Sequence, residues 1–147
     1  MAERQLFCRI ITPERTVFDG EVEMVKLRIA DGDIGVMSDH QPIVSTVGIR
    51  DVQVVMENDE RQIFATSDGF FKVSDNLVQI LVEEAVPAEE IDPDVAGNRI
   101  EDAERLLAET PEDEENERRR RELERERLMG ENLARIHAQY TEGQAGR

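Results

Sequence analysis

The chain has 147 residues, of which 34 are Asp or Glu and 18 are Lys or Arg, so its formal charge is −16 at pH 7. This length suits one domain with an appendage, and so acidic a surface repels nucleic acid and anionic lipid. The single cysteine excludes an internal disulfide. One cysteine and two histidines also supply too few of the usual ligands for a typical zinc site, so we expect no metal and no cofactor. No stretch approaches the roughly 20 apolar residues of a membrane helix, and we expect a soluble chain.

The first part of the chain, residues 1–86, has the composition of β-structure. All five Phe residues and most of the Val and Ile lie there, and such residues favour strands. Apolar and charged residues alternate in Val25–Ile29, as in a strand with one buried face. The other strand-like runs are Leu6–Ile10, Ile34–Met37, Ile49–Met56, Gln62–Thr66, Phe70–Val73 and Leu77–Val82.

Turn signals separate these runs. Asp19-Gly20 and Asp31-Gly32 each place a glycine, which readily adopts a positive φ, after an aspartate. Asn58-Asp59 and Asp75-Asn76 lie between strand-like runs, where hairpin turns are expected. Short strands at this spacing, with no helix long enough for a crossover, predict an antiparallel β-sandwich or barrel.

The second part, residues 87–147, is predicted to form an antiparallel hairpin of two helices. Glu, Arg, Ala and Leu dominate it, and these residues favour helices. The first helix is expected to begin at Asp92-Pro93, an N-cap followed by proline, and to end at Thr110-Pro111. An acidic linker then leads to a second helix, which we expect to reach about Tyr140, with residues 143–147 frayed.

Each predicted helix carries one narrow apolar stripe. The two stripes are Ala96, Ile100, Ala103 and Leu107, and Met129, Leu133, Ile136 and Tyr140. Burying a large apolar side chain contributes ~1.5–3 kcal/mol, whereas ordering each residue costs on the order of 1 kcal/mol or more. The hairpin should therefore depend on docking, against its own sandwich or another protein, and a marginal element of this kind suits a switch.

No group of residues forms a recognisable catalytic site. Ser38, Asp39 and His40 have the residue types of a hydrolytic triad, but adjacent side chains diverge and cannot form the relay on their own. Gly32–Gly35 lacks the lysine and the spacing of a phosphate-binding loop. We therefore expect no catalysis by this chain alone, and from the residues alone we interpret His40 as a hydrogen-bonded loop histidine.

The main basic feature is a run of four arginines, Arg118–Arg121, which continues through Arg125 and Arg127. One interpretation is a solvated helix face with ion pairs at i,i+3 and i,i+4 spacing. Four consecutive arginines wrap most of the way round a helix and repel one another, however, and an acidic partner surface would relieve that repulsion. Nucleic acid is a poorer candidate, because flanking glutamates cancel much of the field.

Several segments resemble the epsilon subunit of rotary F-type ATP synthases. Residues 11–14 (ITPE) and 17–25 (VFDGEVEMV) resemble the opening of that family. Gly32–Ile43 is similar to the family pattern G-[DE]-[LI]-G-[IV]-x-x-x-H-x-P-[LI], and Ser67–Val73 resembles its S-G-G-[FI]-[LV]-E-V segment, from which Asp68 and Lys72 depart. With the helical tail, the resemblance covers about residues 4–140.

The resemblance implies a non-catalytic rotor subunit in the central stalk of a proton-translocating ATP synthase, peripheral on the cytoplasmic face of a bacterial cell membrane. Its sandwich would bind the gamma subunit and rest on the ring of c subunits, so that proton flow is coupled to ATP synthesis. By position, Asp31 and Asp33 correspond to an acidic loop that faces the c ring, and His40 corresponds to a histidine near gamma. The alternative for the two aspartates is a simple acidic turn.

The resemblance also implies a regulatory role for the hairpin. In this family the hairpin lies folded beneath the sandwich or extends into the catalytic head of alpha and beta subunits, where it blocks ATP hydrolysis. The arginines that would contact an acidic loop of a catalytic subunit are Arg118, Arg119, Arg120, Arg121 and Arg125.

Some bacterial members of the family bind ATP through an I-D-x-x-R-A segment at the start of the first helix. The matching residues here are Ile91, Asp92 and Ala96. Val95 stands where the arginine is expected, and an apolar side chain supplies no charge for a phosphate. Arg99, one turn further on, could substitute or could pair with Asp102. We expect weak or absent nucleotide binding.

A stand-alone β-sandwich adaptor, which would bind protein partners through its charged helical hairpin, is the alternative function. It shares much of the same composition. Co-purification from membranes with ATP synthase subunits would separate the two hypotheses. A small β-sandwich hydrolase is disfavoured because the sequence lacks a convergent polar site.

Overall fold

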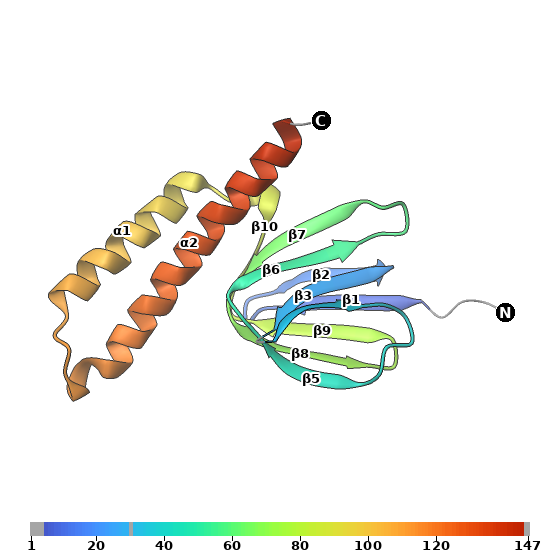
Figure 1. The fold of residues 1–147 in the computed structure, drawn as a ribbon, viewed down its shortest axis with the longest axis horizontal. Helices are drawn as coiled ribbons and strands as arrows, with labels where there is room; N and C mark the ends of the chain where they lie inside the picture. The colour runs from blue at the N-terminus through green and yellow to red at the C-terminus, as the bar shows by residue number, and fades with distance from the viewer. Residues whose placement is uncertain (1–4, 30, 146–147) are drawn as a thin grey trace. The chain divides into compact units, whose positions relative to one another are not determined.

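In a computed structural model, the chain divides into two compact units, of which the first ends at Ala88 and the second begins at Glu89. The structure describes residues 5–29 and 31–145. The first unit is a β-sandwich and the second is a pair of helices (Figure 1). Each unit is described by itself below.

Ten strands lie in the described part of the first unit. They are β1 (Leu6–Ile11), β2 (Thr16–Val22), β3 (Met24–Ile29), β4 (Gly32–Val36), β5 (Ile43–Val47), β6 (Arg50–Val55), β7 (Arg61–Thr66), β8 (Gly69–Ser74), β9 (Leu77–Val82) and β10 (Ala85–Pro87). One sheet has the order β2-β1-β9-β8-β5 and the other has the order β10-β7-β6-β3-β4. This arrangement confirms the predicted sandwich and rules out a single closed barrel.

Strand pairing is antiparallel except between β1 and β9, among the strands that the structure describes. In that parallel pair Cys8 lies opposite Val78 and Ile11 lies opposite Leu81. Parallel neighbours require a long connection, and here the chain passes through both sheets before β9 returns beside β1. The predicted antiparallel pairing therefore holds for the other described strand pairs but not for this one.

The core lies between the two sheets and is built by alternation along each strand. In β3, Val25 and Leu27 are buried, whereas Lys26 and Arg28 lie on the opposite face. The rings of Phe18 and Phe64 meet edge to face with their centroids 5.9 Å apart. Alternation of this kind was the basis of the sequence prediction for Val25–Ile29, and the burial pattern confirms it.

The local turn signals were reliable in three places and wrong in one. Gly32, Asp59 and Asn76 adopt positive φ values of 128°, 67° and 61°, as their expected turns require. Asp19-Gly20, in contrast, lies inside β2, opposite Arg9 and Cys8 of β1. Cross-strand pairing overrides the local preference there, because β2 is an edge strand that tolerates glycine. The strands β2, β5 and β10 were absent from the sequence prediction.

The second unit contains α1 (Pro93–Glu109) and α2 (Glu117–Ala145), with a short 3-10 turn at Glu114–Asn116 between them. Another 3-10 turn, Ala88–Glu90, spans the boundary between the two units. A side-chain oxygen of Asp92 accepts a hydrogen bond from the backbone N–H of Asp94 at 2.9 Å, which confirms the predicted N-cap. The first helix ends before Thr110, as expected. The second helix continues past Tyr140 to Ala145, so its predicted end was too early, and residues 146–147 lie outside the described residues.

The two helices approach each other closely at Gly130. A Cβ atom at this position would lie 2.9 Å from Cγ1 of Ile100 and 3.2 Å from the carbonyl oxygen of Ala96. Ala96 and Ala103 are fully buried, so small side chains on α1 allow the close approach. None of the helices within the described residues is long and apolar enough to cross a membrane.

Candidate functional site

The residues predicted to contact partners through the sandwich lie at opposite ends of β4. Asp31 and Asp33 lie at the start of this strand, and His40 follows its end in the loop of residues 37–42. The strand has five residues, which corresponds to roughly 15 Å of extended chain. The structure therefore does not bring the predicted residues together, and each end offers its own surface.

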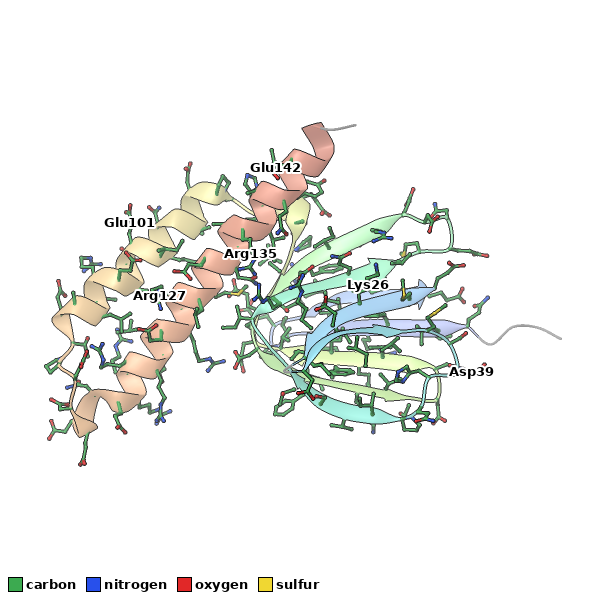
Figure 2. The ribbon with its side chains drawn as sticks, viewed as in Figure 1. Lys26, Asp39, Glu101, Arg127, Arg135 and Glu142 are labelled. Atoms are coloured by element: carbon green, nitrogen blue, oxygen red, sulfur yellow. The ribbon has the colours of Figure 1, made fainter. Side chains whose placement is uncertain are left out.

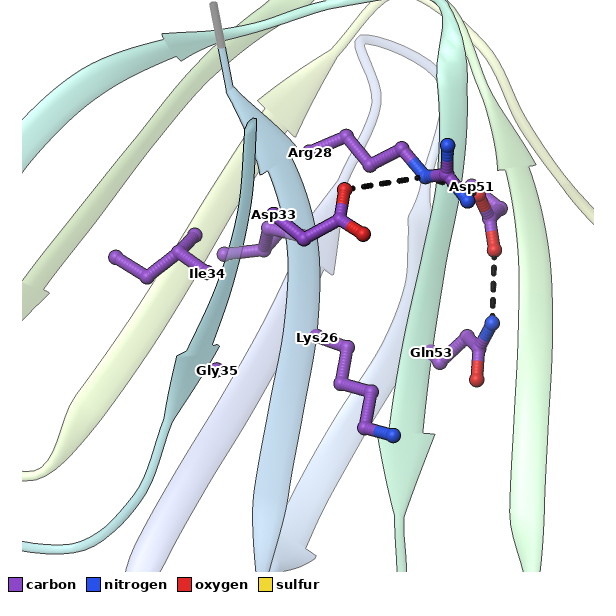
Figure 3. Close-up of a pocket in the computed structure, with 8 residues that line it drawn as sticks. Lys26, Arg28, Asp33, Ile34, Gly35, Asp51 and Gln53 are labelled. Atoms are coloured by element: carbon purple, nitrogen blue, oxygen red, sulfur yellow. Dashed lines mark hydrogen bonds and ion pairs between the residues drawn. The ribbon is translucent and has the colours of Figure 1, made fainter. Parts of the chain in front are cut away.

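Asp33 lies on the outer face of the sheet, directly opposite Arg28 of β3. The Nε atom of Arg28 is 3.4 Å from Oδ1 of Asp33 and 3.5 Å from Oδ1 of Asp51 on β6 (Figure 3). Asp31 is exposed in the turn that precedes β4. The two aspartates are thus not equivalent, because Asp33 already has a partner within the chain.

A groove of about 270 Å³ follows this face of the sheet. Its polar lining includes Lys26, Arg28, Asp33, Asp51 and Gln53. The Nε2 atom of Gln53 donates a hydrogen bond to Oδ2 of Asp51 at 3.0 Å. Sequence reasoning missed Arg28, Asp51 and Gln53. Their signal was the alternation of polar and apolar residues in β3 and β6, which places these side chains on one face.

The loop that carries His40 is tied to the turn between β8 and β9. The backbone N–H of Asp39 donates to Oδ1 of Asn76 at 2.6 Å, and Asp39 itself has a positive φ of 62°. Nδ1 of His40 lies 2.7 Å from the carbonyl oxygen of Gln41, so this ring nitrogen carries the hydrogen and donates it. His40 is a hydrogen-bonded loop histidine, as expected. Figure 2 shows Asp39 beyond the strand ends and Lys26 on the sheet.

The outer face of the other sheet exposes large apolar side chains. Phe70 of β8 and Leu81 of β9 lie opposite each other and are 59% and 48% exposed. Ile11 of β1 lies opposite Leu81 on the other side, so the three side chains form a row across three strands. Val44 of β5 is 70% exposed. We call Ile11, Val44, Phe70 and Leu81 the apolar face, which sequence reasoning did not identify. Exposed apolar residues that lie together indicate a partner surface.

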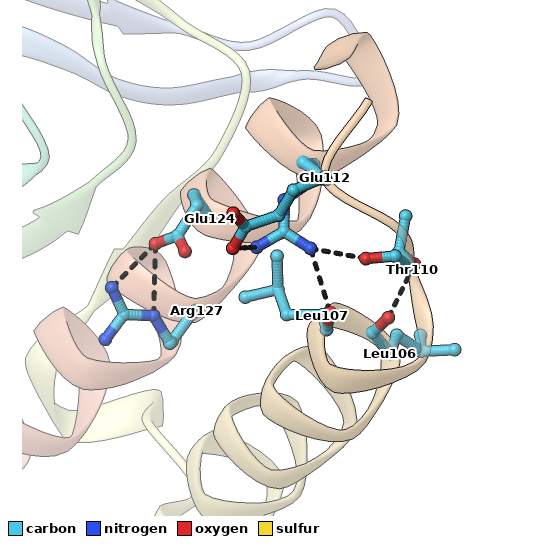
Figure 4. Close-up of polar contacts among 7 residues, drawn as sticks. Leu106, Leu107, Thr110, Glu112, Glu124 and Arg127 are labelled. Carbon is cyan, nitrogen blue, oxygen red and sulfur yellow. Dashed lines mark hydrogen bonds and ion pairs between the residues drawn. The ribbon is translucent and has the colours of Figure 1, made fainter. Parts of the chain in front are cut away.

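The arginine run on α2 divides into two groups. Arg118 is 89% exposed and pairs loosely with Glu122, and Arg119 and Arg121 are also exposed. Arg120 instead points into the hairpin, where its Nη1 atom donates to the carbonyl oxygens of Leu107 and Thr110 at 2.9 and 2.6 Å. Figure 4 shows Leu107 and Thr110 around the end of α1. Arg120 therefore caps the C-terminal end of α1.

Arg120 also lies 3.4 Å from Glu112 through Nη2. Further along α2, the pKa of Arg127 is raised because Glu124 accepts its hydrogen bonds and adds its negative charge, with Glu131 contributing. Arg125 is exposed. The solvent-facing members of the predicted contact are therefore Arg118, Arg119, Arg121 and Arg125, and we call them the arginine surface.

The segment that resembles a nucleotide site has structural roles in this chain. Ile91 is buried, Asp92 caps α1, and Ala96 lies at the close approach to Gly130. Arg99 pairs with Glu126 of α2, with Nε 2.7 Å from Oε1 and Nη2 3.2 Å from Oε2. Arg99 therefore has a partner on the second helix.

Asp102 pairs with Arg105 at 3.3 Å. Glu126 of the neighbouring helix offers both of its carboxylate oxygens to the guanidinium of Arg99. Among the residues that the structure describes, no group of three or more His, Cys, Asp or Glu side chains could hold a metal ion.

Comparison with known proteins finds similarity to ATP synthase epsilon chains. A sequence model described as the beta-sandwich domain of the ATP synthase delta/epsilon chain matches residues 5–88. The chain is 58% identical to the ATP synthase epsilon chain of Rubrobacter xylanophilus over 95% of this chain and 97% of that one. It is 37% identical to the ATP synthase epsilon chain of Caldicellulosiruptor bescii over 92% of this chain and 100% of that one.

Solved structures with a similar fold come from ATP synthases. A chain in the OSCP/F1/c-ring structure of the Euglena gracilis mitochondrial enzyme aligns with a TM-score of 0.70, at 26% identity, over 88% of this chain and 79% of that one. A chain in the central stalk/c-ring structure of the Tetrahymena thermophila mitochondrial enzyme aligns with a TM-score of 0.50, at 14% identity, over 62% and 72% of the two chains.

Proposed function

The chain belongs to the family of ATP synthase epsilon chains, and on that basis we propose that it is a non-catalytic rotor subunit that links gamma to the c ring. In this role it couples proton flow to ATP synthesis and regulates ATP hydrolysis. The observation that carries the proposal is 58% identity to an epsilon chain over almost the whole of both chains. The structure supports it with separate outward surfaces on the sandwich and on the hairpin.

The contact with the c ring is assigned to Asp31 and Asp33. Both carboxylates are exposed at one end of the sandwich, where they can pair with cationic groups on polar loops of the ring. Exposed charge pairs contribute little affinity, but they set the register of an interface and the rate of association. Such a contact suits a surface that must hold its position on the ring.

The contact with gamma is assigned to the apolar face together with His40. Apolar residues in the centre of an interface are typical of permanent partners, whereas transient partners share more polar surfaces. Phe70 and Leu81 supply the largest exposed apolar side chains of the apolar face. His40 lies in the loop just before β5, which carries Val44, so the loop borders the same sheet.

The hairpin is assigned the regulatory role. The arginine surface would contact an acidic loop of the alpha or beta subunits when the hairpin reaches the catalytic head. Arg120 does not share in this contact, because it is bound within the hairpin. Attachment to the cytoplasmic face of a bacterial cell membrane would be peripheral, through the c ring.

Reconstitution tests the function. Membranes stripped of their own epsilon subunit should regain ATP synthesis when the full chain is added, and the chain should co-purify with gamma and c. A Phe70→Ser, Leu81→Ser variant should bind less tightly because it loses apolar area, whereas Lys72→Ser, on the same outward face, serves as the control. A wild-type chain that binds neither gamma nor the c ring would favour the stand-alone adaptor.

Nucleotide binding at the start of α1 should be weak or absent. Val95 is half exposed and supplies no charge, and the guanidinium of Arg99 is paired with Glu126. Isothermal titration of the full chain with ATP should therefore give no saturation at micromolar concentrations. A micromolar dissociation constant would show that other residues of this chain replace the missing arginine.

A further inference from the structure

Three charged side chains form a row across the outer face of β4, β3 and β6. Arg28 lies opposite Asp33 in the pairing of β3 with β4. Lys26 lies opposite Gln53 in the pairing of β3 with β6, so the same antiparallel register places Arg28 beside Asp51. The Nε atom of Arg28 lies 3.4 Å from one carboxylate and 3.5 Å from the other. We call Asp33, Arg28 and Asp51 the charged row.

The two ends of the charged row differ in their surroundings. The side chain of Asp51 is only 14% exposed, and it also accepts a hydrogen bond from Gln53 at 3.0 Å. The side chain of Asp33 is 68% exposed. Asp51 therefore anchors the guanidinium of Arg28 over the sheet, and the exposed Asp33 carboxylate reaches toward the Nε atom of Arg28 from the neighbouring strand (Figure 3).

The difference in exposure between Asp51 and Asp33 affects the entropy that a partner must overcome to bind Asp33. An exposed aspartate on an edge strand samples several rotamers, and a partner must order it at a cost in conformational entropy. The exposed ion pair with Arg28 favours the rotamers in which the Asp33 carboxylate lies over the sheet, so it lowers part of that ordering cost. The row carries two negative charges and one positive charge, so its exposed end still attracts a cation.

We propose that Arg28, anchored by Asp51, is a positioning residue that orients the Asp33 carboxylate toward a cationic side chain on the c ring. This inference rests on the proposed function, because it assumes that Asp33 contacts the ring. Arg28 acts through Asp33 and has no separate contact with the partner. Asp31, which lies in the turn outside the row, contributes charge to the same contact independently of Arg28.

The test uses the full chain added to membranes stripped of their own epsilon subunit, and measures the concentration that half-restores ATP synthesis. Asp33→Asn and Arg28→Gln should each raise this concentration by about three- to tenfold, the effect of one or two exposed charge contacts. Asp51→Asn should act in the same direction as Arg28→Gln. The double variant Asp33→Asn, Arg28→Gln should be no worse than Asp33→Asn alone, because a residue that acts through another adds nothing once that residue is changed.

Arg105→Gln is the control. Arg105 is also an exposed arginine paired with an aspartate, since its Nη2 lies 3.3 Å from Oδ1 of Asp102, and α1 carries none of the residues assigned to gamma or the ring. This variant should leave the half-restoring concentration unchanged, and melting temperatures of all variants should agree with that of the wild-type chain.

The outcomes separate the two proposals. A loss with Asp33→Asn but none with Arg28→Gln would overturn the positioning role and leave the ring contact intact. A further loss in the double variant would also overturn it, because Arg28 would then act on its own. No loss with Asp33→Asn would remove the ring contact at Asp33, and the positioning role with it.

Discussion

At the scale of single residues, Cys8 illustrates how the fold determines chemistry. Its side chain is fully buried between the sheets on β1. Burial raises the pKa of this thiol from 9.0 to about 12, and the nearby charge of Asp19 adds to the effect. The thiolate is the reactive form of cysteine, so a residue type that is often reactive here serves packing alone.

We predict a specific pH dependence of stability from Cys8. Above pH 9 the unfolded chain releases the thiol proton, whereas the folded chain keeps it until about pH 12. Protons then bind more strongly to the folded state, so the free energy of unfolding should fall as pH rises through this window, by at most ~1.4 kcal/mol per pH unit. Urea unfolding of the wild-type chain and of Cys8→Ala at several pH values isolates this slope, since other groups titrate equally in both.

A labelling experiment gives an independent check on the same thiol. An alkylating reagent at about pH 8 should modify Cys8 only in urea, where the chain is unfolded. Rapid modification of the folded chain would contradict the burial of Cys8.

At the scale of elements, the packing of α1 against α2 depends on a missing side chain. We predict that Gly130→Ala destabilises the hairpin, because the new Cβ would lie 3.2 Å from backbone atoms of Ala96 and Ile100, which cannot rotate away. Overpacking costs ~1–3 kcal/mol, and the better helix propensity of alanine offsets ~1 kcal/mol of it. Thermal unfolding followed by the helical circular dichroism signal measures the net loss.

The control for Gly130 is Gly97, which lies on α1. A Cβ atom at Gly97 would meet nothing within 4 Å. Gly97→Ala should therefore raise the melting temperature through helix propensity alone, since the same substitution here adds no contact. Equal shifts for the two variants would contradict the close approach of the helices at Gly130.

The cap that Arg120 provides is a second element-scale prediction. Arg120→Gln removes charged hydrogen bonds to two carbonyl oxygens at the end of α1. Hydrogen bonds to charged groups contribute ~1.5–3 kcal/mol, and partial exposure reduces this, so we expect a loss of about 1–2 kcal/mol. Hydrogen exchange of the amides in the last turn of α1 should accelerate accordingly. Arg119→Gln, which changes an exposed neighbour, should shift stability by less than about 0.5 kcal/mol.

At the scale of the whole molecule, the sequence predicted the secondary-structure elements and the fold class better than it predicted which residues contact each other. Alternation in Val25–Ile29 and the cap at Asp92 depend on local chemistry, so they could be predicted from neighbours in the sequence. The position of Asp19-Gly20 inside β2 depends on β1, which pairs with it across the sheet. No local pattern contains that information.

In the candidate sites, too, local sequence identified single residues but not their partners on other strands or helices. The resemblance identified Asp33, but its partners Arg28 and Asp51 come from two other strands. The four arginines looked equivalent in the sequence, yet helical geometry turns Arg120 toward carbonyl groups of α1. Residue type and spacing predicted which surfaces matter, whereas the ion pairs within them required the register of strands and helices.

The last prediction concerns regulation of the assembled enzyme. If the arginine surface holds the hairpin against an acidic catalytic subunit, the triple variant Arg118→Gln, Arg119→Gln, Arg121→Gln should raise ATP hydrolysis. Exposed charge contacts contribute ~0.2–1 kcal/mol each, so three together shift the balance between docked and undocked hairpins by up to about a hundredfold. Added salt should raise hydrolysis by the wild-type enzyme more than by the variant, because only the wild-type contact is screened.

Arg105→Gln on α1 is the control for charge loss elsewhere on the hairpin, and it should leave hydrolysis unchanged. Arg120→Gln distinguishes the contact with the catalytic subunit from the stability of the hairpin. Arg120 stabilises the hairpin through hydrogen bonds to the end of α1 and does not face the partner. Hydrolysis that rises with Arg120→Gln but not with the triple variant would mean that inhibition depends on an intact helical pair and not on its exposed charge. Unchanged hydrolysis in the triple variant would refute an inhibitory contact by Arg118, Arg119 and Arg121, three of the four residues of the arginine surface.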